Sequence, residues 1–306
     1  MSGARRFLHT NLNTADAAAA SAFYRDAFGL RVVMQTRSDP VDGALYGTPG
    51  VDTHSDATFL YDDRGPRQAV GLELQEWYRP PVDGELYADV RTPGMQALGL
   101  AVPTLDGLEE RVVAHGGRVV ARLDSDLRGS GEPTMWIRDR DGVLVEVAEQ
   151  GGIPGTRLQR LVVSTADVDA ALRFYAAVGF GPAAQHRVDD APAVMPTAPD
   201  GGGLDAHDLR LPDDPGFALL LLAWDEPAAG AAYDRPWHRG LYRCALAVDD
   251  VRAEHARLVG AGFDRVDPPT TVPMAGTKVG DLTVCFLRDP FGVTVELVER
   301  PRAAFA

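Results

Sequence analysis

Residues 13–30 read NTADAAAASAFYRDAFGL, and residues 164–181 read STADVDAALRFYAAVGFG. The two stretches share an aspartate (Asp16 and Asp167) and a Phe-Tyr pair in the helix-like part, at one constant offset along the chain. Each begins with a turn residue and continues with apolar residues at helical spacing. The similarity predicts that one structural unit occurs at least twice.

Two further matches extend this repeat along the chain. LAVPTLDGLEERVVAHGG (100–117) matches LAVDDVRAEHARLVGAGF (246–263), and RDRDGVLVEVAE (138–149) matches RDPFGVTVELVE (288–299). Three matched stretches in the same order indicate a duplication of about half the chain. The Gly/Pro-rich stretch QGGIPGTR (150–157) is typical of a linker between the halves. We therefore expect domains at 1–150 and 156–306.

Each half contains two smaller units. A strand ending in a turn residue precedes a short amphipathic helix, which is expected at 16–28 in the first unit and near 105–116 in the second. Two or three strands follow each helix. The pattern predicts an α+β fold with four β-α-β-β-β modules, which pair to form cup-like mixed sheets with helices on one face.

The composition limits the partners. The net charge is −14, and nucleic acid and anionic membrane surfaces both require a basic face. The two cysteines, Cys244 and Cys285, lie in apolar strand-like runs, which favours a reducing, cytoplasmic setting. The sequence has no apolar run long enough for a membrane span and no Gly-rich phosphate loop. We expect a small-molecule ligand, no nucleotide cofactor, and a monomer or homodimer.

The motifs together resemble the vicinal oxygen chelate superfamily, which includes glyoxalases, bleomycin-resistance proteins and extradiol dioxygenases. The stretches that carry the resemblance are 9–30, 100–117 and 139–147, together with their second-half copies. The resemblance implies that paired modules form a cup. It also implies that metal ligands, where present, stand on the first and last strands of the modules and point into it.

Strand alternation identifies the side chains that would face such a cup in the first half. We interpret His9, Glu73 and Glu146 as ligands of one divalent ion, for which Zn, Fe, Mn, Ni and Co are all suitable. The fourth position, commonly histidine in glyoxalase-like and ring-cleaving members, is Ala97. A metal-free pocket, in which His9 bonds Glu146, stays open as the alternative.

The corresponding positions of the second half are Arg160, Leu220, Arg243 and Glu296. A guanidinium stays protonated and does not bind divalent cations, so this second, degenerate cup is not expected to hold a metal. Arg160, Arg243 and Glu296 would form either an anion-binding clamp or a buried ion triad.

Two classes of function follow. The first is an enzyme acting on a small oxygenated metabolite by isomerase, lyase or dioxygenase-like chemistry, with Glu73 and Glu146 as catalytic groups. The second is a metal-free protein that binds or sequesters an aromatic or antibiotic-like ligand, as resistance proteins of the same fold do. In the enzyme we expect four further side chains to contact the substrate: Asn11, Gln75, Trp77 and His54. In the binding protein, Trp77 and the small residues of the fifth strand would provide a stacking surface and room.

Overall fold

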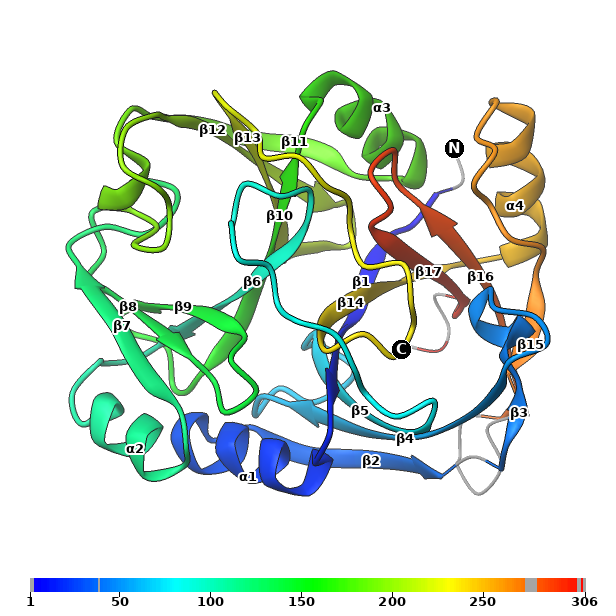
Figure 1. Cartoon of the computed structure of the whole chain (residues 1–306), viewed down its shortest axis with the longest axis horizontal. Coiled ribbons are helices and arrows are strands. Elements are labelled where there is room, and N and C mark those ends of the chain that lie inside the picture. Colours follow the sequence, from blue (N-terminus) through cyan, green and yellow to red (C-terminus); the bar gives the residue numbers. More distant parts are fainter. Residues whose placement is uncertain (1–2, 38, 273–279, 302–303, 305–306) are drawn as a thin grey trace.

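The computed structural model describes residues 3–37, 39–272, 280–301 and 304. It contains the four expected modules (Figure 1). The first comprises β1 (Arg6–Thr14), α1 (Ala17–Phe28), β2 (Arg31–Arg37), β4 (Asp52–Tyr61) and β5 (Gly71–Arg79), with β3 (Val41–Asp42) and the 3-10 turn η1 (Gly43–Tyr46) inserted. The second comprises β6 (Gly94–Val102), α2 (Leu108–Ala114), β7 (Arg118–Leu123), β8 (Thr134–Arg138) and β9 (Leu144–Glu149).

The second half of the chain repeats this order. The third module comprises β10 (Arg157–Thr165), α3 (Val168–Val178), β11 (Gly181–Val188), η2 (Ala191–Ala193), β12 (Leu204–Leu211) and β13 (Asp214–Trp224). The fourth comprises β14 (Gly240–Val248), α4 (Val251–Gly260), β15 (Thr270–Val272), β16 (Leu282–Arg288) and β17 (Thr294–Glu299). The α+β class is confirmed, with few helices outside two curled mixed sheets.

The modules do not pair in sequence order. One sheet runs β15-β16-β17-β14-β1-β5-β4-β2, and the other runs β11-β12-β13-β10-β6-β9-β8-β7. The first module therefore joins the fourth through an antiparallel β1–β14 contact, and the second joins the third through β6–β10. Each sheet contains strands from both halves of the chain, so residues of one half are divided between two cups.

The repeated aspartates of the sequence start the helices. The carboxylates of Asp16, Asp167 and Asp250 each accept a hydrogen bond from the backbone N–H three residues on, at 2.8, 2.9 and 2.9 Å respectively. These N-caps satisfy N–H groups that have no partner within the helix. The capping role explains why the aspartate recurs at this place in three of the four modules.

The repeated tyrosine connects neighbouring modules. The hydroxyl of Tyr24 on α1 donates to Asp139 at 2.7 Å, and Tyr175 on α3 donates to Asp289 at 3.3 Å. Each aspartate also accepts backbone N–H groups of its own hairpin turn, including that of Val143 or Val293. One repeated pair of residues thus fixes both the turn and the packing of the helix against the next module.

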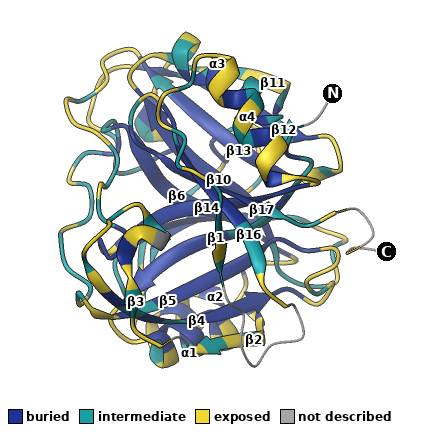
Figure 2. Ribbon diagram, turned by 90° about the vertical axis from the view of Figure 1, so that its right-hand side faces the viewer, coloured by how far each residue is buried: buried dark blue, intermediate teal, exposed yellow. Residues whose placement is uncertain are grey.

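The largest apolar core lies between the helices and the sheets, where the strands are buried (Figure 2). Phe7 belongs to this core and packs against Phe217 with ring centroids 4.3 Å apart. The register of the β1–β14 pairing shifts between Phe7 and His9, so these two side chains point to opposite faces of the sheet. Within the described residues no helix is long and apolar enough to cross a membrane.

Candidate functional site in the His9 cup

The first and fourth modules form a polar cluster that we call the His9 cup, defined by His9, Glu73, Arg243 and Glu296. These side chains come from β1, β5, β14 and β17, which are adjacent strands of one sheet. Glu73 lies beside Asn11, and Glu296 lies beside Ala245 in the parallel pairings. The cup thus combines two first-strand and two last-strand positions, as the resemblance implies, but takes them from opposite ends of the chain.

Arg243 is the centre of this cluster. Its Nη2 donates to both carboxylate oxygens of Glu73 at 2.9 and 2.8 Å, and its Nε donates to Glu296 Oε2 at 3.0 Å. Its Nη1 donates to Gln75 Oε1 at 2.8 Å. Charge-assisted bonds of this kind hold a planar guanidinium in one orientation. Arg243 therefore neutralises and orders two buried carboxylates at once.

His9 faces the same carboxylates without a formed hydrogen bond. Its Nε2 lies 3.4 Å from Glu73 Oε2 and 3.9 Å from Glu296 Oε2. Among the described residues this buried nitrogen has no hydrogen-bond partner. The ring also meets Phe59 edge to face at 5.3 Å between centroids. Buried polar atoms without a partner are uncommon in folded proteins, which marks this nitrogen as a candidate ligand contact.

The electrostatics of the cup leave His9 neutral at neutral pH and give Glu296 both a protonated and an ionised form there. Burial lowers the pKa of His9 to about 4, although Glu73 opposes the shift. Burial also raises the pKa of Glu296 to about 7, and outweighs the opposing effect of Arg243. For Arg243, burial alone would lower the pKa, but Glu73 and Glu296 raise it above its ordinary value. The cup therefore combines a fixed cation with a carboxyl group that titrates near neutrality.

A second layer of amides and hydroxyls holds Arg243 in place. Asn11 Nδ2 donates to Gln75 Oε1 at 3.1 Å, and Gln75 Nε2 donates to Ser55 Oγ at 2.8 Å. Tyr46, on the η1 turn, is hydrogen-bonded to Ser55, and burial raises the pKa of its phenol. Asn11 and Gln75 are thus near the site, as expected. Both polar atoms of the Gln75 amide and Nδ2 of Asn11 bond to protein groups, whereas Asn11 Oδ1 has no hydrogen-bond partner among the described residues.

Trp77 and His54 each pack against another aromatic side chain. Trp77 Nε1 donates to Asn13 Oδ1 at 3.0 Å, and its ring meets Tyr46 at 5.0 Å. The indole is 3% exposed, so it offers no free stacking face. His54 packs against Tyr78 with ring centroids 5.0 Å apart, whereas its neighbour Ser55 is the residue bonded to Gln75.

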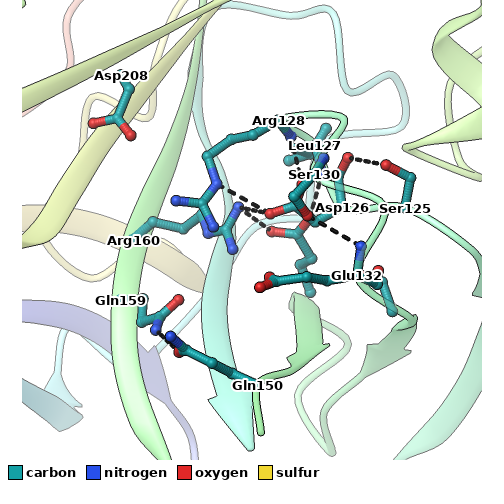
Figure 3. A network of polar contacts seen from close by, with 12 residues as sticks. Ser125, Asp126, Leu127, Arg128, Ser130, Glu132, Gln150, Gln159, Arg160 and Asp208 are labelled. Atoms are coloured by element: carbon teal, nitrogen blue, oxygen red, sulfur yellow. Dashed lines mark hydrogen bonds and ion pairs between the residues drawn. The ribbon is translucent and has the colours of Figure 1, made fainter. Parts of the chain in front are cut away.

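Glu146 lies in the other cup, which we call the Arg160 cup and define by Asp126, Glu146 and Arg160. Figure 3 shows Asp126 and Arg160 of this cup facing each other. Arg160 Nη1 donates to Asp126 Oδ2 at 3.0 Å and lies 3.2 Å from Glu146 Oε2. Glu146 Oε1 accepts the backbone N–H of Leu127 at 2.7 Å. Burial raises the pKa of Glu146 against the effect of Arg160. For Asp126, burial acts in the same direction, but Arg160 and Arg128 hold the pKa well below its ordinary value.

The small residues of β6 make room for an arginine instead of a ligand. Gly99 is paired with Arg160, and a Cβ built on Gly99 would lie 2.1 Å from Arg160 Cγ. Around the ion pairs the cup is filled by an apolar cluster that includes Trp136, Met195 and Leu220. This cup is a packed core with a buried ionic centre.

Two sequence-based interpretations are therefore wrong. Glu146 does not share a cup with His9 and Glu73, because β9 belongs to the second sheet. Arg160 and Arg243 do not form one triad or clamp with Glu296, because β10 and β14 also lie in different sheets. Both errors have one cause: the interpretation pairs the two modules of each half, whereas the fold pairs the first module with the fourth and the second with the third.

Four features of the two cups are absent from the sequence-based prediction: Ser55, Tyr46, Asp126 and the combination of Glu296 with His9. Counting along β4 from Phe59 would identify Ser55 as facing the cup. Tyr46 and Asp126 lie outside regular strands, and no periodic signal marks them. Glu296 has the expected strand position but belongs to the cup of His9 and not to that of Arg160.

The donor atoms of the His9 cup are of the kinds that divalent ions take, but their arrangement does not fit a resident ion. The guanidinium of Arg243 occupies the space between Glu73 and Glu296 that a cation would need. Among the described residues no group of three or more His, Cys, Asp or Glu side chains is arranged to hold a metal. The expected set of His9, Glu73 and Glu146 is divided between the cups.

The paired modules and the first- and last-strand site positions define a glyoxalase-type protein. The family model for the Glyoxalase/Bleomycin resistance protein/Dioxygenase superfamily matches residues 6–147 and 157–297, and the chain belongs to this superfamily. Lactoylglutathione lyase from Arabidopsis thaliana is 26% identical over 172 residues, which are 56% of this chain and 53% of that protein. The chain thus matches about half the length of this relative.

Two solved structures support the fold over nearly the whole chain. Glyoxalase I from Zea mays has a TM-score of 0.65 at 17% identity, with 96% of this chain and 92% of that chain covered. A variant of the same maize enzyme has a TM-score of 0.67 at 17% identity, with 96% and 94% covered. At this identity the likeness shows a common fold.

Proposed function

We propose that this chain is an enzyme that moves a proton on a small oxygenated molecule, as an isomerase or lyase, in the His9 cup. The observation that carries the proposal is the unpartnered Nε2 of His9 opposite two carboxylates that Arg243 holds in place. Membership of a superfamily that contains glyoxalases supports an enzymatic role.

In this reaction Glu296 is the acid–base group. As a carboxylate it takes a proton from a carbon next to a carbonyl group, and as a carboxylic acid it returns that proton to a neighbouring atom. Its pKa of about 7 allows both forms near neutral pH. The positive charge of Arg243 stabilises the enolate while it exists. Neutral His9 donates or accepts a hydrogen bond at Nε2 and orients the substrate oxygen.

Proton exchange with solvent tests the proposal whatever the final product of the reaction is. The purified protein would be incubated in D₂O with a panel of α-hydroxyketones, 2-oxoaldehyde–thiol adducts and S-lactoylglutathione, and deuterium uptake followed by NMR. We expect Glu296→Gln to lose about 10²-fold or more in exchange rate. Glu146→Gln, a last-strand glutamate of the other cup, is the matched control and is expected to keep the wild-type rate per folded molecule.

The measurement also separates the second class of function. Tight binding of a panel member without exchange would support a metal-free binding or sequestration protein. A folded Glu296→Gln variant that exchanges protons as fast as the wild type would contradict the proposed role of Glu296.

A further inference from the structure

Equivalent positions in the four modules show what Arg243 replaces. His9 and Arg243 are the first-strand residues of the His9 cup, and they lie on the adjacent strands β1 and β14. Glu73 and Glu296 are the last-strand residues that face them. In the superfamily that the sequence resembles, these four positions are where ligands of a divalent ion stand. Three of the four are side chains that bind such ions, and the fourth is a guanidinium.

The contacts of Arg243 are those that a central cation would make. The guanidinium touches both carboxylates, and Nε2 of His9 lies within 4 Å of an oxygen from each of them. Two buried carboxylates without a counter-charge would disfavour folding, and a cation placed between them offsets that cost. The chain supplies that cation itself.

The Arg160 cup provides a second, independent case of an arginine that lies in the place of a central cation. Arg160, also a first-strand residue, pairs with the last-strand residue Glu146 and with Asp126. The two arginines stand in modules that are not equivalent to each other. Arg160 in the third module corresponds to His9 in the first, and Arg243 in the fourth module corresponds to Ala97 in the second. Each of the two cups therefore holds an arginine guanidinium beside the carboxylates where a divalent ion would stand.

We infer that Arg243 is a built-in replacement for a divalent ion, so that the His9 cup binds an uncharged oxygenated ligand without a resident metal. An anionic group would face Glu73 and Glu296, whereas a carbonyl or hydroxyl group meets a neutralised cluster and the free nitrogen of His9. The inference relies on the proposed function only for the location of the site.

The test is the metal content of matched variants. Wild type, Arg243→His, Arg243→Ala and Ala97→His would be dialysed against Zn²⁺, Ni²⁺ or Mn²⁺. Bound ions would be measured by elemental analysis, and the melting temperature recorded with and without each ion. Wild type is expected to bind no ion in the cup. Arg243→His, which presents two imidazoles and two carboxylates, is expected to bind about one ion per chain and to melt higher with it.

The controls locate the new site. Adding His9→Ala to Arg243→His should abolish ion binding. Ala97→His makes the equivalent change in the Arg160 cup, and it should bind no ion because Arg160 remains and Leu220 supplies no ligand. Arg243→Ala should gain ion-dependent stabilisation even if Arg243→His folds poorly.

Two outcomes would overturn the inference. One is a wild-type protein that binds an ion lost on His9→Ala. The other is that Arg243→His and Arg243→Ala are both folded and bind no more ion than the wild type. Neither outcome depends on substrate turnover, so the inference and the proton-transfer proposal can fail separately.

Discussion

The His9 cup and the Arg160 cup descend from the same module pair but differ in what surrounds their arginine. The side chains of Arg243 and Glu296 are 7% and 10% exposed, whereas those of Arg160 and Glu146 are 1% and 0% exposed. The Arg160 cup has apolar side chains around its ion pairs, and the His9 cup retains an imidazole with an unpartnered nitrogen. The ionic cluster is therefore fully buried in one cup and slightly exposed in the other.

The difference shows how a duplicated fold can divide its roles. In the Arg160 cup the loop residue Asp126 supplies a second carboxylate, and Leu220 stands where the His9 cup has Glu73. In the His9 cup both carboxylates come from last strands, and an amide network supports the guanidinium. The guanidinium of one cup is thus paired with a loop carboxylate, and that of the other is supported by an amide network.

The largest expected effect is on the free energy of unfolding, when the fully buried Arg160 is replaced. Arg160→Met should destabilise the protein by about 3–5 kcal/mol, because it leaves Asp126 and Glu146 buried without a cation. Arg243→Met should cost less, about 1–3 kcal/mol, since Glu296 can take up a proton and reach solvent. Urea unfolding of both variants measures the two values. Equal losses of stability in the two variants would contradict the distinction between a fully buried and a slightly exposed ionic cluster.

The pH dependence of stability gives an intermediate effect. Burial raises the pKa of Glu296 to about 7 in the folded state, above its ordinary value of 4.5. This group therefore contributes stability that is fully present below about pH 4.5 and is lost as the pH rises through about 7. The stability difference between wild type and Glu296→Gln should fall by roughly 2–3 kcal/mol across this interval.

Urea unfolding at several pH values measures that difference. His9 has the opposite dependence, because its pKa is lowered, but it is present in both proteins and largely cancels. Glu85→Gln, which changes an exposed carboxylate, is the control. A difference that rises with pH would contradict the assigned burial of Glu296.

The smallest expected effect concerns one hydroxyl in each cup. Ser164 accepts from Trp224 at 2.9 Å and donates to the Val90 carbonyl at 2.6 Å, whereas Ser55 joins Gln75 to Tyr46. Each Ser→Ala change should cost about 1 kcal/mol of stability. Only Ser55→Ala should also slow proton exchange, because it loosens the support of Arg243. Slower proton exchange in Ser164→Ala would contradict the assignment of proton transfer to the His9 cup alone.

Much of the fold can be predicted from local sequence. The repeats, the α+β class and the helix following Asp16 depend on periodicity and on capping, which act over a few residues. Strand alternation likewise identifies His9, Glu73, Arg243 and Glu296 as cup-facing positions, because successive side chains point to opposite faces.

The composition of each cup was decided only by tertiary structure. Every module offers the same open strand edge, so the sequence does not state whether the first module pairs with the second or with the fourth. Formation of the β1–β14 contact places Arg243 and Glu296 beside His9 and Glu73, and it separates all four from Glu146. The sequence by itself determined which residues face a cup. The choice of strand edge, a contact between distant segments, determined which of them meet.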